Sequence, residues 1–246
     1  MSFEEAVPTG GLVALERATL RDVDFRKVRF ERFALSGCVF VNCDFRGIRF
    51  DRKFQPLFAS PRQSVFRQCR FDGSDLRKMQ PSQARFEACT FDDAVIEKWS
   101  STLAEFVDCR FSGPIVSSRF YGRPWGTEAG KVDPPRRVNE FRGNDFSGAE
   151  LQETIFLMGI DIDAQRWPDD KDYVRLDRMN MRLTKARDEI LRWKDLRARN
   201  AAHEMVQTMS VTYLQQSSVI ARRVEPLSAI PADVQREVWA LLARVL

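Results

Sequence analysis

Large apolar residues recur at every fifth position over most of the chain from Leu20 to Phe156. Between positions 20 and 50 the series is unbroken, with Leu20, Phe25, Phe30, Leu35, Phe40, Phe45 and Phe50. The register restarts at Phe66 and continues, with some gaps, to Phe156. A period of five matches neither the turn of an amphipathic helix nor the strict alternation of a half-buried strand. The pattern therefore predicts a repetitive coil, and an internal repeat of this kind decides the fold of the whole region.

A smaller residue stands two positions before most of the large ones, and all five cysteines occupy this slot. Similar residues also recur every 20 positions. Four units of five residues per turn would stack them in ladders about 4.8 Å apart, the spacing of neighbouring strands. We expect an inward-facing core ladder made of Phe66, Cys69, Phe71, Phe86, Cys89, Phe91, Phe106, Cys109 and Phe111. The cysteines are interpreted as small core residues, because their number is odd and no CxxC pair occurs.

Three segments carry the repeat most clearly: VNCDFRGIRF (41–50), RQCRFDGSDL (67–76) and RGNDFSGAEL (142–151). With Phe or Leu at the centre of each unit, they resemble the pentapeptide-repeat family, whose pattern is roughly A(D/N)LXX. The resemblance implies a mainly β fold, a right-handed, four-sided (quadrilateral) parallel β-helix. It covers residues 16–158 and follows an N-terminal segment, residues 1–15.

Two interruptions of the repeat, at 51–63 and 121–138, predict loops on the surface of the coil, where binding residues are often found. The first contains apolar residues that we expect to be exposed, and the second contains three glycines and three prolines. Loops that merely vary in length would give the same pattern. Aromatic and arginine side chains are favoured interface anchors. The candidate partner-binding residues are Phe54, Phe58, Tyr121, Arg123, Trp125, Arg136 and Arg137.

The period changes after the repeat. Residues 159–172 are typical of a cap or linker, and residues 173–246 predict an α-helical capping, docking or dimerisation module. A 3–4 spacing runs from Leu176 to Trp193, a second helix is expected near 200–222, and Pro231 would open a third. The module has few large apolar residues, so we expect it to pack on the end of the coil, to dimerise, or both.

No catalytic constellation emerges from the sequence. The chain has one histidine, and neither a nucleophile triad, an HExxH motif nor a phosphate loop is present in a suitable context. We predict a protein that is not an enzyme and has no metal site and no cofactor. No apolar run could span a membrane, and no secretory signal is visible, so we expect a cytoplasmic protein without a membrane partner. The basic stretch at 171–199 alternates with acids, so nucleic-acid binding is not expected.

Three functional hypotheses follow. The first is a non-catalytic protein–protein interaction scaffold that presents coil faces, two loops and a helical module to a protein partner. The second rests on the resemblance: members that confer quinolone resistance bind and protect DNA gyrase or topoisomerase IV, and some are proposed to mimic DNA with an acidic surface. Here residues 1–165 hold 24 basic and 24 acidic side chains, a neutral total. In the third, the helical domain is the docking or oligomerisation module and the solenoid is a spacer.

Overall fold

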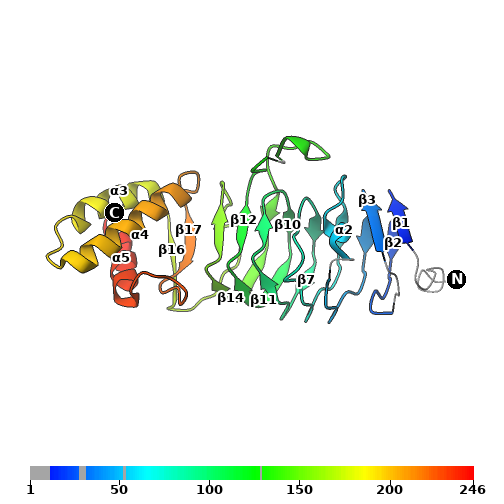
Figure 1. Ribbon diagram of the computed structural model, residues 1–246, viewed down its shortest axis with the longest axis horizontal. Coiled ribbons are helices and arrows are strands. Elements are labelled where there is room, and N and C mark those ends of the chain that lie inside the picture. The colour runs from blue at the N-terminus through cyan, green and yellow to red at the C-terminus, as the bar shows by residue number, and fades with distance from the viewer. Residues whose placement is uncertain (1–11, 28–31, 52–53, 128) are drawn as a thin grey trace.

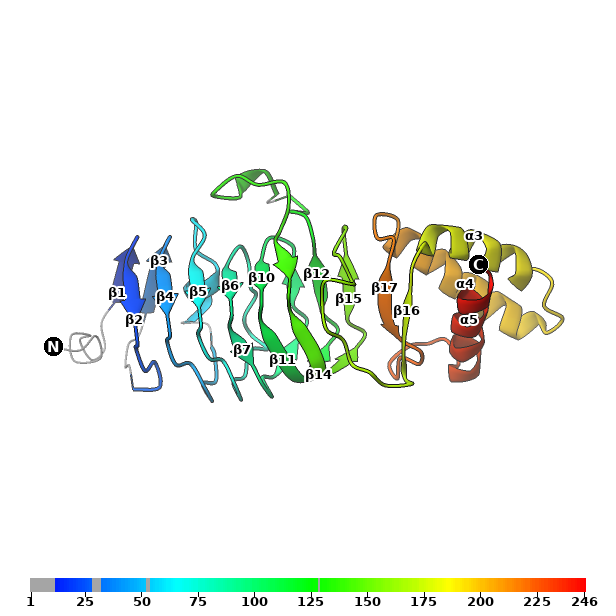
Figure 2. The same ribbon diagram turned by 180° about the vertical axis from the view of Figure 1, so that it is seen from behind.

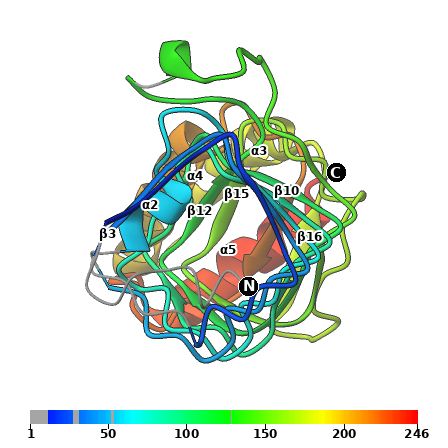
Figure 3. The same ribbon diagram turned by 90° about the vertical axis from the view of Figure 1, so that its right-hand side faces the viewer.

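The computed structural model describes residues 12–27, 32–51, 54–127 and 129–246. It shows an elongated stack of short parallel strands with a helical module at one end (Figures 1 and 2). Seen along the long axis, the strands outline one closed coil, and the 122–138 loop lies outside it (Figure 3). Residues 1–11 of the predicted N-terminal segment, Phe30 of the repeat and residues 52–53 of the first interruption lie outside the described residues.

The strands of the coil pair in parallel throughout, as expected of a β-helix. The strands are β1 (Leu12–Glu16), β2 (Thr19–Arg21), β3 (Arg32–Ser36), β4 (Val39–Val41), β5 (Val65–Arg67), β6 (Arg85–Glu87), β7 (Thr90–Phe91), β8 (Ile96–Glu97), β9 (Ser100–Ser101), β10 (Glu105–Val107), β11 (Arg110–Val116), β12 (Arg119–Tyr121), β13 (Phe141–Arg142), β14 (Asp145–Gln152) and β15 (Ile155–Leu157). Two short helices, α2 (Gln55–Phe58) and η2 (Ala129–Lys131), lie in the two interruptions. The largest sheet has the order β13-β10-β6-β5-β4-β2.

The strand register explains the two periods of the sequence. Phe66 pairs with Phe86, and Phe86 pairs with Phe106, so the longer period of the sequence is one full turn of the coil. Phe40 pairs with Phe66, and Phe106 pairs with Phe141, across longer stretches of chain. The two interruptions are therefore insertions into single turns. The chain leaves the coil at each insertion and returns to the same ladder.

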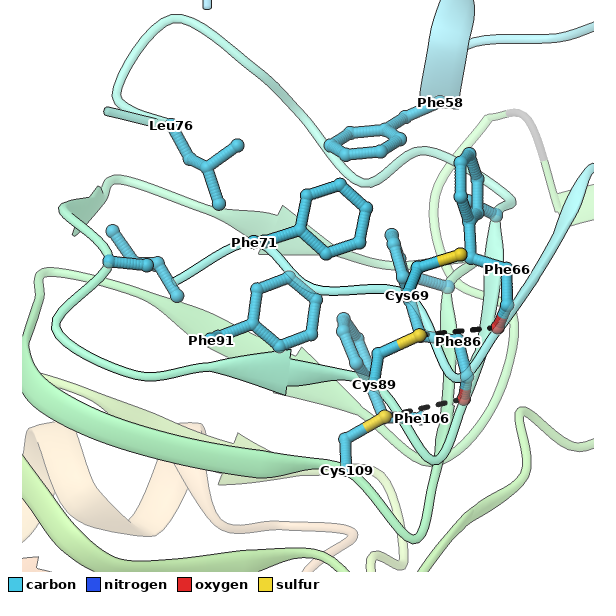
Figure 4. Packing of buried hydrophobic residues seen from close by; sticks show 14 of the residues in the cluster. Phe58, Phe66, Cys69, Phe71, Leu76, Phe86, Cys89, Phe91, Phe106 and Cys109 are labelled. Carbon is cyan, nitrogen blue, oxygen red and sulfur yellow. Dashed lines mark hydrogen bonds between the residues drawn. The ribbon is translucent and has the colours of Figure 1, made fainter. Parts of the chain in front are cut away.

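Stacked phenylalanines fill the coil (Figure 4). The ring of Phe86 lies 5.2 Å from that of Phe66 and 5.1 Å from that of Phe106, nearly parallel to both. A second stack joins Phe71, Phe91 and Phe111, with ring centroids 5.0 and 4.8 Å apart. All of these rings are essentially inaccessible to solvent. Since a buried aromatic ring contributes a large apolar area, these ladders are the main source of stability in the coil.

In several units the smaller slot has a polar task, although alanine fills it in others. The Cys89 thiol donates to the Phe66 carbonyl oxygen at 3.3 Å, and the Cys109 thiol donates to that of Phe86 at 3.5 Å (Figure 4). Ser74 fills the slot in another unit, and its hydroxyl donates to the Phe45 carbonyl at 2.7 Å. A buried carbonyl requires a partner, so in these units the slot favours a small side chain with a donor. The five cysteines are free thiols, and burial raises the pKa of Cys89.

The C-terminal module contains β16 (Tyr173–Leu176), α3 (Met179–Ile190), α4 (Leu196–Thr212), β17 (Val219–Arg222) and α5 (Ala232–Arg244). Two details of the sequence prediction were wrong. Residues 173–176 form a strand and not the start of a helix, and the second helix ends at Thr212, before β17. Strands β16 and β17 pair antiparallel, and the buried side chains of β16 alternate as in a half-buried strand. No helix in the described ranges is long and apolar enough to cross a membrane.

The module closes the open end of the coil. The Gln216 side chain accepts hydrogen bonds from the backbone N–H groups of Gly159 and Ile160, at 2.8 and 3.1 Å. The Tyr173 hydroxyl accepts one from the Leu151 N–H at 2.9 Å, and Ile220 is part of the apolar core of the coil. These contacts pair edge groups that would otherwise be free to join another strand. Packing on the coil end is thus observed, while dimerisation stays a prediction.

Candidate protein-interaction surface

The loop at 122–138 is tied to the coil at both ends. At its start, the Trp125 backbone N–H donates to the Thr102 carbonyl at 3.2 Å. At its end, the buried Asn139 amide donates to the carbonyls of Thr102 and Tyr121, at 2.9 and 3.0 Å. Val132, near the middle of the loop, is also buried. The loop therefore has a fixed position although it projects from the solenoid (Figures 1 and 3).

The two interruptions of the repeat contact one another. The Gln63 N–H donates to the Asp133 carbonyl at 2.8 Å, and the Arg62 guanidinium lies 3.8 Å from the Asp133 carboxylate. The buried Gln83 side chain accepts from the Asp133 N–H at 3.1 Å and donates to the Ser60 carbonyl at 2.8 Å. We call residues 54–63, 122–127 and 129–138 together the loop pair. The sequence predicted two separate loops, and the structure joins them into one surface.

Glu105 lies at the centre of this junction and is almost completely buried. Its carboxylate accepts from the Gln63 side-chain amide at 2.8 Å and from the Glu140 backbone N–H at 2.9 Å. It also lies 3.3 Å from the Arg85 guanidinium and 3.8 Å from that of Arg136. One carboxylate thus connects the first insertion, the second insertion and the coil. Sequence reasoning missed Glu105, because a charged residue beside Phe106 looks like any outward position of the repeat.

The structure corrects the assignment of Phe54 and Phe58 as exposed contact residues. Phe58 is 0% and Phe54 is 7% exposed, both within the core of the coil. Helix α2 turns Phe58 inward, where its ring meets those of Phe66 and Phe86 edge to face at 5.4 and 5.2 Å. Phe58 thus supplies a large inward side chain to the turn of the coil that contains the insertion. The sequence analysis places the apolar residues of this segment on the surface, but their number indicates that the segment packs into the core of the coil.

The other five candidates divide into two buried and three exposed residues. Tyr121 is buried against the helical module. Arg136 is mostly buried, donates to the Leu103 carbonyl, and its pKa is lowered by loss of solvation. Arg123, Trp125 and Arg137 face solvent, with Trp125 50% exposed. Val138, which was not a candidate, is 60% exposed beside Arg137.

Arginines neutralise many of the carboxylates on the coil surface. Asp44 lies within 3.4 Å of three guanidinium groups, those of Arg26, Arg46 and Arg70. Burial of Asp44 tends to raise the pKa of its carboxyl, but the hydrogen bonds from Arg46 outweigh this, and the pKa is lowered. A second network runs across the largest sheet through Arg67, Glu87, Arg85, Glu140 and Arg142. Carboxylates paired in this way do not form an uncompensated acidic face.

Comparison with protein families matches eight copies of the pentapeptide repeat to residues 15–52. Residues 15–52 therefore carry pentapeptide repeats, and the parallel sheets of the described residues are those of a β-helix. No curated protein matches it in a sequence search.

Among solved structures, the chain is similar to full-length QnrB1, described as a plasmid-mediated fluoroquinolone resistance protein. The identity is 17% over 63% of this chain and 82% of that chain, with a TM-score of 0.24. A trypsin-treated variant of QnrB1 gives 18% identity over 65% and 73% of the two chains, with a TM-score of 0.21.

Proposed function

We propose that this chain is a non-catalytic scaffold that binds a protein partner through the loop pair. The observation that carries the proposal is Trp125, a half-exposed tryptophan on a loop that buried hydrogen bonds fix at both ends. Tryptophan and arginine are the residues most often found at the energetic centre of interfaces. Arg123, Arg137 and Val138 are exposed on the same loop and provide further contacts.

The anchoring of the loop supports the same function. Binding costs free energy when a mobile segment must be ordered, and a preorganised loop avoids that cost. Asp133, Gln63 and Gln83 hold the second insertion against the first before any partner arrives. We further infer a right-handed coil with four sides, consistent with the register of β5, β6 and β10. The five buried, free thiols are consistent with a reducing cytoplasmic location.

The charge pattern weighs against one form of the topoisomerase hypothesis. A protein that imitates duplex DNA needs a row of unpaired carboxylates, whereas Asp44, Glu87 and Glu140 are paired with arginines. Binding of gyrase or topoisomerase IV would then use the loop pair, through contacts that do not imitate DNA. The third hypothesis, docking through the helical module, would use its exposed apolar residues, such as Val211 and Leu214.

Affinity purification of the tagged full-length chain from its native host distinguishes these functions. We expect Trp125→Ala to abolish recovery of the partner, because loss of a central tryptophan weakens an interface by about 2 kcal/mol or more, which is thirtyfold in Kd. Leu214→Ala is the matched control on the helical module and should recover the partner normally.

Each result has a definite meaning. Recovery of gyrase or topoisomerase IV subunits, lost with Trp125→Ala, would identify the partner as a topoisomerase. Recovery of a different protein with the same loss would support the scaffold function and name its partner. A partner lost with Leu214→Ala but retained with Trp125→Ala would contradict the proposal and favour docking through the helical module.

A further inference from the structure

A cavity of about 480 Å³ lies between the coil and the helical module, away from the loop pair. The coil side is formed by residues of β9, β12 and β15, including Ser100, Arg119 and Ile155. The module side is formed by α4 and α5, including Met209 and Trp239. The volume falls in the range of small-molecule sites, which often occur where two structural units meet.

One wall of the cavity is apolar and adaptable. Met205 and Met209 contribute flexible thioether side chains from successive turns of α4, and Trp239 contributes an indole ring from α5. Ile155 faces them from the coil. Methionine side chains adjust to ligands of irregular shape and make favourable contacts with aromatic rings. This wall suits a flat or branched hydrocarbon body.

Three hydrogen-bond donors around the cavity have no acceptor within the described part of the chain. The Tyr213 hydroxyl and the Trp239 indole N–H belong to side chains that are only 5% and 3% exposed. Arg119 is exposed at the cavity and forms no ion pair with any described residue. Among the described residues, the buried side-chain atoms without a partner are Thr90 Oγ1 and Arg136 Nη1, so the donor atoms of Tyr213 and Trp239 are open to solvent and are available to an acceptor in the cavity.

Several acceptors that line the cavity take part in hydrogen bonds within the protein. The Glu225 carboxylate accepts from the Glu153 backbone N–H at 2.8 Å, and the Glu153 carboxylate accepts from the Ser117 hydroxyl at 3.0 Å. The Gln235 amide oxygen accepts from the Glu225 N–H at 2.7 Å, and its nitrogen donates to the Ile230 carbonyl at 2.7 Å. Of the basic side chains that line the cavity, Lys98 and Arg222 pair with Glu97 and Glu150, whereas Arg119 has no ion-pair partner among the described residues and favours a ligand with negative charge.

We propose that this cavity binds a small organic anion with an apolar body, of the aromatic carboxylate or sulfonate class. The anionic group contacts Arg119 and lies within reach of the donors of Tyr213 and Trp239, while the body packs against Met205 and Met209. Burial raises the pKa of the Tyr213 hydroxyl, so this group stays protonated as a donor at neutral pH. Because the ligand contacts both the coil and the module, it should also stabilise their junction.

The test is a fluorescence titration of the full-length chain with 8-anilinonaphthalene-1-sulfonate, a sulfonate with an aromatic body. We expect one probe per chain with a blue-shifted emission. Arg119→Ala should weaken binding at least tenfold, because hydrogen bonds to charged groups are among the strongest that a protein makes. Thr208→Trp should abolish binding, since Thr208 lines the cavity and is exposed enough to accept a larger side chain without disturbing the core.

Arg197→Ala is the matched control, an exposed arginine in the first turn of α4 that does not line the cavity. Its affinity for the probe should equal that of the natural chain, and far-UV circular dichroism should show that all variants are folded. An unchanged affinity in Arg119→Ala, full binding in Thr208→Trp, or more than one probe per chain would each overturn the proposal. Trp125→Ala should bind the probe normally, so this test is independent of the proposed partner.

Discussion

Replacing Phe86 by alanine is expected to lower the free energy of unfolding by about 3–5 kcal/mol, the usual cost of truncating a fully buried phenylalanine. Phe86 is 0% exposed and stacks between Phe66 and Phe106. Its ring also meets those of Phe58 and Phe91 edge to face. Strand pairing holds neighbouring turns of the coil at a fixed spacing. The turns therefore cannot close the space that the missing ring leaves, and most of this cavity should persist.

Urea unfolding followed by far-UV circular dichroism measures this change. Val95→Ala is the matched control, because Val95 belongs to the same coil region and is 38% exposed. Its effect should stay within about 0.5 kcal/mol, as for most surface substitutions. A loss below about 1 kcal/mol in Phe86→Ala, well under the usual cost, would show that the stacked rings do not hold the coil together.

Replacing Glu105 by alanine is expected to cost about 3–5 kcal/mol, because it leaves the mostly buried Arg136 without the carboxylate beside it, whereas Arg85 keeps Glu87 and Glu140. The guanidinium groups of Arg85 and Arg136 would lose this carboxylate, and so would the side-chain amide of Gln63. The substitution should destabilise the loop pair itself as well as the whole fold. The backbone amides of the loop pair should exchange with solvent faster than in the natural chain.

Hydrogen–deuterium exchange read by mass spectrometry, together with urea unfolding, separates these two effects. Glu97→Ala is the matched control, since Glu97 is an outward glutamate of the same coil whose partner is the exposed Lys98. An exposed pair contributes at most about 1 kcal/mol, and the loop pair should keep its protection in this variant. Normal protection of residues 122–138 in Glu105→Ala would contradict the role assigned to Glu105.

The repeat was readable in the sequence because a period of five leaves a regular trace. Phe66, Phe86 and Phe106 recur at a constant interval in the sequence and are paired neighbours in one sheet. The small slot was also visible, although its polar task appears only when the carbonyl partners of Cys89 and Ser74 are seen. The periodicity of the sequence thus predicts which residues face inward and how the turns of the coil stack.

Features that depend on contacts distant in sequence were not predictable. The position of Phe58 inside the coil follows from the turn of α2, which a non-repetitive segment does not encode as a period. The junction at Glu105 joins Gln63 and Arg136, which are far apart in the sequence, by a contact that no motif marks. The cavity beside Arg119 exists only because the helical module lies against the coil. The sequence did not predict strand β16, because the apolar residues that begin at its end are spaced as in a helix.

The most direct test of the proposed function is photo-cross-linking in the native host, with benzoylphenylalanine at position 125. A half-exposed residue at the centre of an interface should cross-link to one protein in high yield. The same group at position 214, on the helical module, is the control. We predict a single partner from position 125 and no such product from position 214. A product from position 214 alone would contradict the proposed function, because the partner would then contact the helical module and not the loop pair.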